Sequence, residues 1–134
     1  MEITVSQEQA VTILQLSGQL DGQTYETLIS KAREAMEGGA RNVLLDLSEL
    51  TYISSAGLVS LHTIALMTRG ETPPDSEQGW SALKSMDKNR DGGVQKNIKL
   101  LNPRPEVSSV LDMVGFSAFF EVFTDKQKAI ESFS

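Results

Sequence analysis

Polar and apolar residues alternate in two short stretches at the start of the chain. Residues 2–7 and 11–17 both follow the two-residue period of a half-buried strand. Only residues 8–10 lie between them, which leaves room for a short turn. The pattern predicts an N-terminal antiparallel hairpin, and it breaks at residues 18–22, where the sequence is GQLDG.

The period then becomes helical and alternates with apolar runs. Residues 24–37 place their apolar side chains on one stripe of a helix, which Thr24 or Asp21 could cap and Gly38 ends. The nearly continuous apolar run at 42–47 is typical of a strand in the middle of a sheet. Further along, the pattern predicts a helix at about 56–68, a strand at 97–101, a short helix at 106–114, an aromatic core cluster at 116–123 and a last helix at 125–133.

Residues 71–96 interrupt this pattern. The segment is strongly polar, contains a Pro-Pro and a Gly-Gly pair, and favours at most one helical turn, at 80–86. We interpret it as a polar insertion within a single domain that spans residues 1–134.

One part of this insertion resembles the opening of an EF-hand calcium loop. Asp87, Asn89 and Asp91 place oxygen atoms at alternate positions, and a glycine follows at the sixth. The closing glutamate is missing, because Ile98 stands at the twelfth position. A polar turn is therefore the favoured interpretation, and no metal ion is expected.

The order of the elements, β-β-α-β-α-β-α-α, predicts the fold class. It implies an α/β fold with a mixed sheet of four or five strands and helices packed on it. Right-handed crossovers bring the carboxyl ends of its three parallel strands to one edge of the sheet. The turns after these strands are 18–22, 51–56 and 102–105. Four polar residues are thereby expected on a common rim: Asp21, Ser54, Ser55 and Asn102.

Composition and charge narrow the classes of function. The 134 residues carry a formal net charge of −6, which disfavours nucleic acid and anionic membrane surfaces as partners. The absence of cysteine excludes disulfides, thiolate nucleophiles and zinc–thiolate sites. No apolar run approaches the roughly 18 residues of a membrane span, and the acidic start does not resemble a signal peptide. We expect a cytoplasmic protein.

Motifs that indicate an enzyme are missing from the sequence. There is no G-x-x-x-x-G-K-[ST] loop and no G-x-S-x-G turn. The one histidine, His62, lies in the middle of a predicted helix without a nucleophile or carboxylate at matching spacing. We therefore expect neither enzymatic activity nor a cofactor.

The candidate chemistry lies where the strand at 42–47 leads through a polar turn into the next helix. Ser54 and Ser55 stand at the start of that helix, where backbone N–H groups point outward and the helix dipole favours negative charge. One interpretation is a helix cap, which contributes about 1 kcal/mol. The other is a phosphate acceptor, and the two are compatible. The turn predicts a switch point rather than a catalytic centre.

Gly57 and Asp21 each have a structural and a second interpretation. Gly57 lies in the first helical turn, where glycine costs about 1 kcal/mol relative to alanine. Close approach of another backbone or a packing constraint within the fold would explain it. Asp21 either begins a turn or contacts a partner.

Three segments of the chain together resemble a known family. In SGQLDGQTYETL (17–28), NVLLDLSELTYISSAGLVSL (42–61) and LLNPRPEVSSVLDMVGFSAFFEVFTDKQKAIESF (100–133), the sequence is similar to the STAS-domain anti-sigma factor antagonists. The resemblance covers nearly the whole chain except about 71–96. It implies a bacterial, non-enzymatic transcription regulator that binds a serine kinase acting as an anti-sigma factor. Phosphorylation would release the kinase, and a serine phosphatase would reset the protein.

The resemblance also implies roles for individual residues. Ser55 stands at the family's phosphoacceptor position, with Ser54, where the family often has Asp, as the second choice. Ala56 replaces the Ser or Thr that usually follows the acceptor. Contact with the partner is implied for six residues at and next to the turn: Asp21, Ser54, Ser55, Ala56, Gly57 and Leu58.

Two other functions stay open. The first is a constitutive STAS scaffold, a subunit of a stressosome-like or transporter-associated complex without a phosphorylation cycle. The serine at position 54 and the insertion at 71–96 favour it. The second is an enzyme or small-ligand binder, which no motif supports.

Overall fold

The structure of the protein is a computed structural model that describes residues 1–68 and 96–133. The predicted insertion at 71–96, except its last residue, lies outside the described residues. So do the residues of the EF-hand-like segment: Asp87, Asn89 and Asp91.

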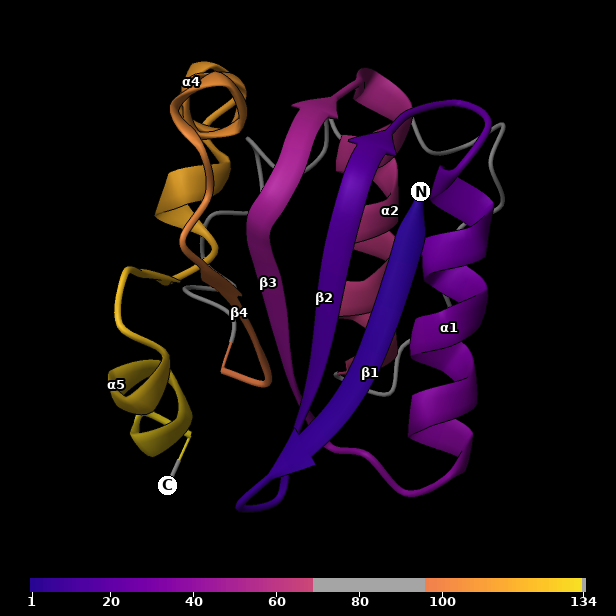
Figure 1. Cartoon of the computed structure of the whole chain (residues 1–134), viewed down its shortest axis with the longest axis vertical. Coiled ribbons are helices and arrows are strands. Elements are labelled where there is room, and N and C mark those ends of the chain that lie inside the picture. Colours follow the sequence, from indigo (N-terminus) through magenta and orange to yellow (C-terminus); the bar gives the residue numbers. More distant parts are fainter. Residues whose placement is uncertain (69–95, 134) are drawn as a thin grey trace.

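Five strands form one mixed sheet in the order β1-β2-β3-β4-β5 (Figure 1). Their bounds are β1 Glu2–Glu8, β2 Val11–Leu20, β3 Asn42–Ile53, β4 Ile98–Leu101 and β5 Val122–Phe123. β1 runs antiparallel to β2, whereas β2, β3, β4 and β5 run parallel to one another. The predicted α/β class is confirmed. The two-residue strand β5 was not predicted, because its sequence had been assigned to an aromatic core cluster.

The helices cover the two faces of the sheet unequally. Their bounds are α1 Tyr25–Glu37, α2 Ser55–Thr68, α4 Pro105–Met113, the short 3-10 helix η2 Phe116–Ala118 and α5 Lys126–Glu131. α1 and α2 contact each other and pack into the same core on one face of the sheet; in Figure 1, α2 lies behind the strands and α1 at the right, beside β1. The six-residue helix α5 packs on the opposite face, which we call the front face.

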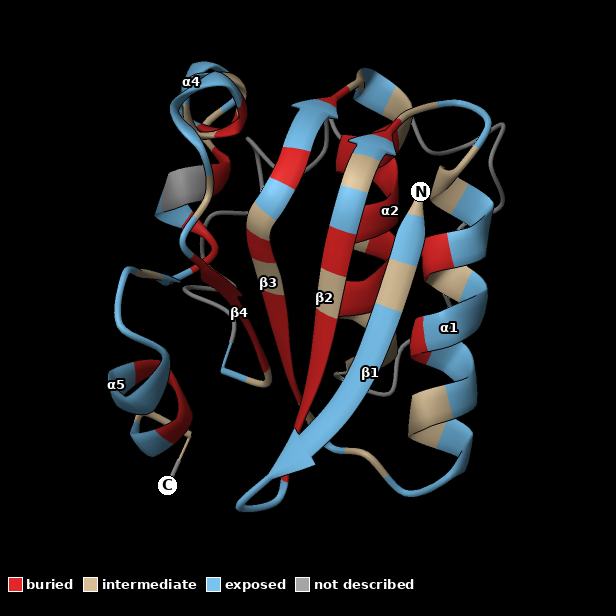
Figure 2. Cartoon of the chain, in the orientation of Figure 1, coloured by how far each residue is buried: buried red, intermediate tan, exposed pale blue. Residues whose placement is uncertain are grey.

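Burial divides the molecule into two cores (Figure 2). The main core fills the space between the sheet and the helices behind it, and Leu14, Leu28 and Leu61 are among its fully buried members. The second core lies on the front face under α5, and it consists of Val11, Ile13, Leu44, Leu101, Ala129 and Ile130. Since both faces of β2 are covered at its start, four consecutive residues there are buried and the alternation fades.

The hairpin between β1 and β2 is confirmed, with a shorter turn than predicted. Glu8 belongs to β1, so that only Gln9 and Ala10 form the turn. Both have a positive φ, 50° and 68°, which is the backbone of a type I′ turn.

β2 and β3 are longer than predicted, which corrects the positions of two turns. β2 continues through Gly18 to Leu20, and β3 continues from Leu47 to Ile53. Two register shifts between these strands disturb the alternation and hid the strands from a two-residue pattern. At one of them Gly18 has a φ of 114°, which L-residues rarely adopt.

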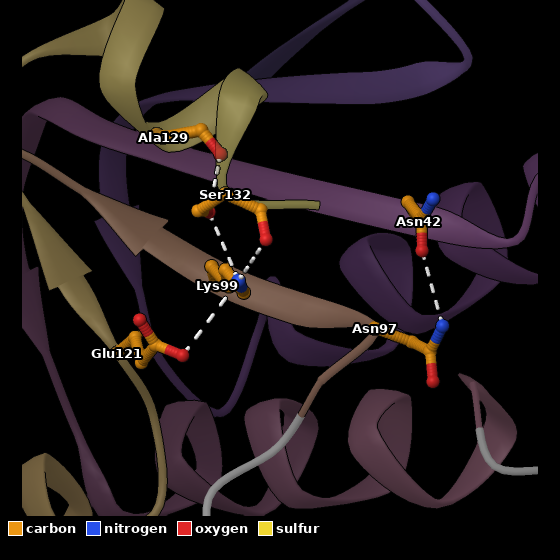
Figure 3. A network of polar contacts seen from close by, with 6 residues as sticks. All are labelled: Asn42, Asn97, Lys99, Glu121, Ala129 and Ser132. Carbon is orange, nitrogen blue, oxygen red and sulfur yellow. Dashed lines mark hydrogen bonds and ion pairs between the residues drawn. The ribbon is translucent and has the colours of Figure 1, made fainter. Parts of the chain in front are cut away.

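A buried lysine fastens α5 to the sheet (Figure 3). The ammonium of Lys99 in β4 donates hydrogen bonds to the Oγ atom (2.9 Å) and the carbonyl oxygen (3.1 Å) of Ser132. It lies 3.6 Å from a carboxylate oxygen of Glu121 and 4.7 Å from the ring centroid of Phe133. The cation thus meets the negative end of the α5 dipole, where a positive charge is stabilising.

Candidate functional site

The carboxyl ends of β2 and β3 lie side by side and begin the candidate site. Leu20 and Ile53, the last residues of the two strands, pair with each other. The next residue, Ser54, donates its backbone N–H to the carbonyl oxygen of Leu20 at 2.9 Å. Asp21 and Ser54 therefore follow neighbouring strand ends, as predicted from the order of the elements.

The two serines occupy different positions at the start of α2. Ser54 is half-buried and is the only residue between β3 and α2. Its Oγ accepts the backbone N–H of Gly57 at 3.4 Å, and its carbonyl oxygen accepts that of Leu58 at 3.0 Å. Ser55 is the first residue of the helix, and its side chain is exposed. Ser54 therefore caps the helix, while the hydroxyl of Ser55 is accessible.

The electrostatics at the start of α2 favour a negative charge. The first turn of the helix contains no acidic residue. The positive end of its dipole is therefore not neutralised by a side chain of the helix itself. Because Ser54 is also uncharged, a phosphate on Ser55 would meet no carboxylate from Ser54 or from the first turn of α2.

Gly57 fixes how closely α2 approaches the sheet. A Cβ atom at this position would lie 2.7 Å from Cγ1 of Ile53 and 2.9 Å from the carbonyl oxygen of Leu20. Side chains do not tolerate such distances, so only glycine fits without a shift of the helix. Both interpretations from the sequence are correct, since another backbone approaches closely and the constraint lies within the fold.

Asp21 builds the turn between β2 and α1. Its Oδ1 accepts the backbone N–H of Gln23 at 2.9 Å, and its own N–H donates to Oγ1 of Thr24 at 2.9 Å. The hydroxyl of Thr24 donates to the carbonyl oxygen of Gln19 at 2.8 Å. Thr24 precedes α1 without a side-chain cap hydrogen bond. The turn-forming role of Asp21 is thus observed, and its contact with a partner stays a prediction.

The remaining predicted partner-binding residues differ in accessibility. Ala56 is half-buried, whereas Gly57 is buried and the side chain of Leu58 is only 3% exposed. Leu58 belongs to the main core. Gly57 and Leu58 therefore support the rim from beneath, and their contact with a partner stays a prediction.

Asn102 does not join the rim, which corrects an expectation from the sequence. It follows Leu101 at the end of β4, and Leu101 pairs with Asp46, seven residues before β3 ends at Ile53. At about 3.3 Å per residue, Asn102 lies roughly 20 Å below the rim along β3. The backbone N–H of Asn102 instead donates to the carbonyl oxygen of Phe123 at 2.6 Å. The order of elements gives the edge of a sheet but not the relative lengths of its strands.

Tyr52 lies near the rim and was not predicted from the sequence as a candidate residue. Its side chain is 49% exposed, one residue before the end of β3. The stretch around it had been assigned to a turn. Its β-branched and aromatic composition, LTYI, is the signal that favours a strand there.

The described residues offer no site for metal chemistry. Nowhere in 1–68 and 96–133 do three or more His, Asp or Glu side chains gather closely enough to hold a metal ion. No helix in the described part of the chain has the length and apolar character that crossing a membrane requires.

Comparison with known families matches more than half of the chain to one family. The model described as "Mlab, STAS domain" matches residues 3–72. Among curated proteins, BtrV of Bordetella bronchiseptica, provisionally described as an anti-sigma factor antagonist, is 26% identical over 133 residues. The match covers 99% of this chain and 95% of BtrV.

Solved structures share the fold. An anti-sigma factor antagonist from Mycobacterium paratuberculosis matches with a TM-score of 0.69 and 15% identity, over 98% of this chain and 92% of that one. The Bacillus cell-fate determinant SpoIIAA in its phosphorylated form matches with a TM-score of 0.56 and 17% identity, over 97% of each chain. These comparisons confirm the resemblance that the sequence motifs carry.

Proposed function

The chain belongs to the STAS domain family, and from this premise we propose that it is an anti-sigma factor antagonist that works by partner switching. In its unphosphorylated form it binds a serine kinase that acts as an anti-sigma factor. Phosphorylation of Ser55 releases the kinase, and a serine phosphatase restores the binding form. The observation that carries the proposal is the exposed hydroxyl of Ser55 at the first residue of α2, beside the turn of Asp21.

The physical basis of the switch is a change of charge on a rigid surface. A phosphoserine adds about 1.5 to 2 negative charges at neutral pH. At the start of α2 this charge interacts favourably with the helix dipole, so the fold is retained. A partner surface packed against the rim would lose the uncharged hydroxyl and meet a hydrated dianion. Release therefore follows from disruption of the interface, and the protein itself needs no catalytic group.

Three variants test this proposal. Ser55→Ala should bind the anti-sigma factor constitutively, and Ser55→Glu should lose most of its binding. Ser54→Ala is the matched control, because it removes a neighbouring hydroxyl that caps the helix and should leave phosphorylation by kinase and ATP intact. Equal binding by all three variants, together with no phosphate on Ser55, would contradict the proposal.

One observation favours a second candidate, a constitutive scaffold without a phosphorylation cycle. Ser54 stands where the family often has Asp, so the local charge that accompanies the phosphoacceptor in relatives is absent. A scaffold would bind its complex equally well as wild type and as Ser55→Glu. Affinity measurements with these two proteins separate the candidates.

A further inference from the structure

The described helices cover only part of the front face of the sheet. α5 packs on it near the amino ends of β2 and β3, against Val11, Ile13 and Leu44. Towards the carboxyl ends the same strands become half-buried and exposed, which Figure 2 shows as the change from red to tan and blue along β2 and β3. β2 and β3 are parallel, and parallel strands are usually covered on both faces. The open part of this face is therefore a candidate for covering by another molecule.

Cross-strand pairing identifies the side chains on this open part. Gln15 pairs with Asp46, and Ser17 pairs with both Glu2 and Glu49. The neighbours Leu14 and Leu16 are buried in the main core on the opposite face, so these residues point to the front. The amide of Gln15 lies 3.5 Å from the Asp46 carboxylate, which links the two strands on this side. We call Glu2, Gln15, Asp46, Glu49 and Tyr52 the acidic sheet patch.

The patch carries negative charge that the described part of the chain does not neutralise. Glu2, Asp46 and Glu49 have no ion pair among the described residues. Two ion pairs lie close to α5, where the sheet is already covered: Glu8 with Lys126 at 3.3 Å and Lys99 with Glu121 at 3.6 Å. A complementary surface must therefore supply cations, which disfavours both nucleic acid and a second copy of this acidic face.

The patch is also continuous with the rim. Tyr52 pairs with Gln19, and both lie two residues before a rim residue, Ser54 and Asp21 respectively. Tyr52 is 49% exposed, and a half-exposed tyrosine offers the apolar body and polar tip that are enriched in protein interfaces. One partner can reach the rim and the patch across the carboxyl end of β3.

We propose that the acidic sheet patch receives a basic surface of the same anti-sigma factor that binds the rim. This inference rests on the proposed function. Lysine or arginine side chains of the partner face Glu2, Asp46 and Glu49, and Tyr52 packs at the border with the rim. The charges steer the encounter and set its orientation, whereas the state of Ser55 decides how long the complex lasts.

The test compares association rates of variants that carry the same total charge. Glu2→Lys/Glu49→Lys reverses two patch charges, and Glu34→Lys/Glu37→Lys reverses two exposed charges of α1; each changes the net charge by four units, from −6 to −2. The probe is the purified anti-sigma factor recovered with the Ser55→Ala protein. We expect the patch variant to associate about tenfold more slowly at low salt, with a flattened salt dependence and a dissociation rate within about twofold of wild type.

The α1 variant is the control for net charge. If it slows association as much as the patch variant, the effect is general charge and the inference is wrong. Unchanged association by the patch variant would also overturn it. Glu2→Gln/Glu49→Gln repeats the test with smaller changes, and it should give an intermediate rate. Circular dichroism should show native folding of all these proteins, because every substituted side chain is exposed.

Failure of the inference can be told apart from failure of the proposed function. If Ser55→Glu loses binding while the patch variants associate normally, the switch stands and the patch is not an interface. If wild type and Ser55→Ala bind no anti-sigma factor, the proposed function and the inference both fall. If Tyr52→Ala raises the dissociation rate severalfold while the charge reversals act on association, both the packing of Tyr52 at the border and the steering by the patch charges are supported.

Discussion

The helices α2 and α5 both pack against strands β2 and β3, but they are attached in different ways. At the rim, one glycine lets α2 contact the ends of β2 and β3 with no room for a methyl group. On the front face, the six-residue helix α5 packs with two of its own buried residues on four buried residues of the sheet, and it is joined to the sheet by a polar network around Lys99. The rim is tied into the main core, and a switch that acts by charge needs such a rigid base. The α5 region is expected to open more easily.

Gly57→Ala should have the largest effect on stability, because it breaks the rim. The added methyl group would meet the carbonyl oxygen of Leu20, which cannot move aside as a side chain can. We expect a loss of about 2 kcal/mol in the free energy of unfolding, measured by urea denaturation. Gly22→Ala is the matched control, since a Cβ there meets nothing within 4 Å. Equal stability of the two variants would contradict the account of the rim.

Lys99→Met should weaken the α5 region and leave the rim intact. The methionine retains the apolar stem and removes the hydrogen bonds to Ser132, so we expect a loss of about 1 kcal/mol. Hydrogen exchange should become faster in α5 and β5 while α2 keeps its protection. Lys126→Met removes an exposed ion pair to Glu8 and should change stability by less than about 0.5 kcal/mol. Uniformly faster exchange throughout the Lys99 variant would argue against a separate α5 unit.

Ser54→Ala sharpens the distinction between the two serines. It removes the acceptor for the N–H of Gly57, and since that bond is long, we expect a loss of about 0.5 to 1 kcal/mol. Ser55→Ala should change the midpoint of thermal unfolding much less, because the Ser55 side chain is exposed. A larger loss for Ser55→Ala would reverse the assignment of the cap.

Ser55→Glu should have the smallest effect on stability and the largest effect on binding. The carboxylate at the first residue of α2 interacts favourably with the helix dipole, so stability should rise or stay within about 0.5 kcal/mol. Calorimetric titration with the anti-sigma factor should show loss of binding. A variant that unfolds would show that phosphorylation acts through the fold and not through the interface.

Much of the fold was predictable because the hydrophobic periodicity of each helix or strand is set by residues close in sequence. The hairpin, the stripe of α1 and the apolar run at the start of β3 each follow from residues close in sequence. The second half of β3 was missed, since its register shifts against β2 place exposed residues next to each other at Thr51 and Tyr52. β5 is two residues long and carries no period of its own.

The candidate site was predictable in part for the same reason. Asp21 and Ser54 came together because they follow strands that are neighbours in the sheet. Asn102 did not join them. Its position along the sheet depends on where the short strand β4 pairs with the longer β3, and that register is set by tertiary packing. The separate positions of Ser54 and Ser55 depend on the residue at which the helix begins, and sequence patterns leave such boundaries open.

The most direct test of the central claim is peptide mass spectrometry of the protein isolated from its native cells under several growth conditions. The account predicts phosphate on Ser55, with the anti-sigma factor copurifying only with the unphosphorylated form. Phosphate confined to Ser54, or its absence from both serines under every condition, would contradict the account. The second outcome would favour the constitutive scaffold.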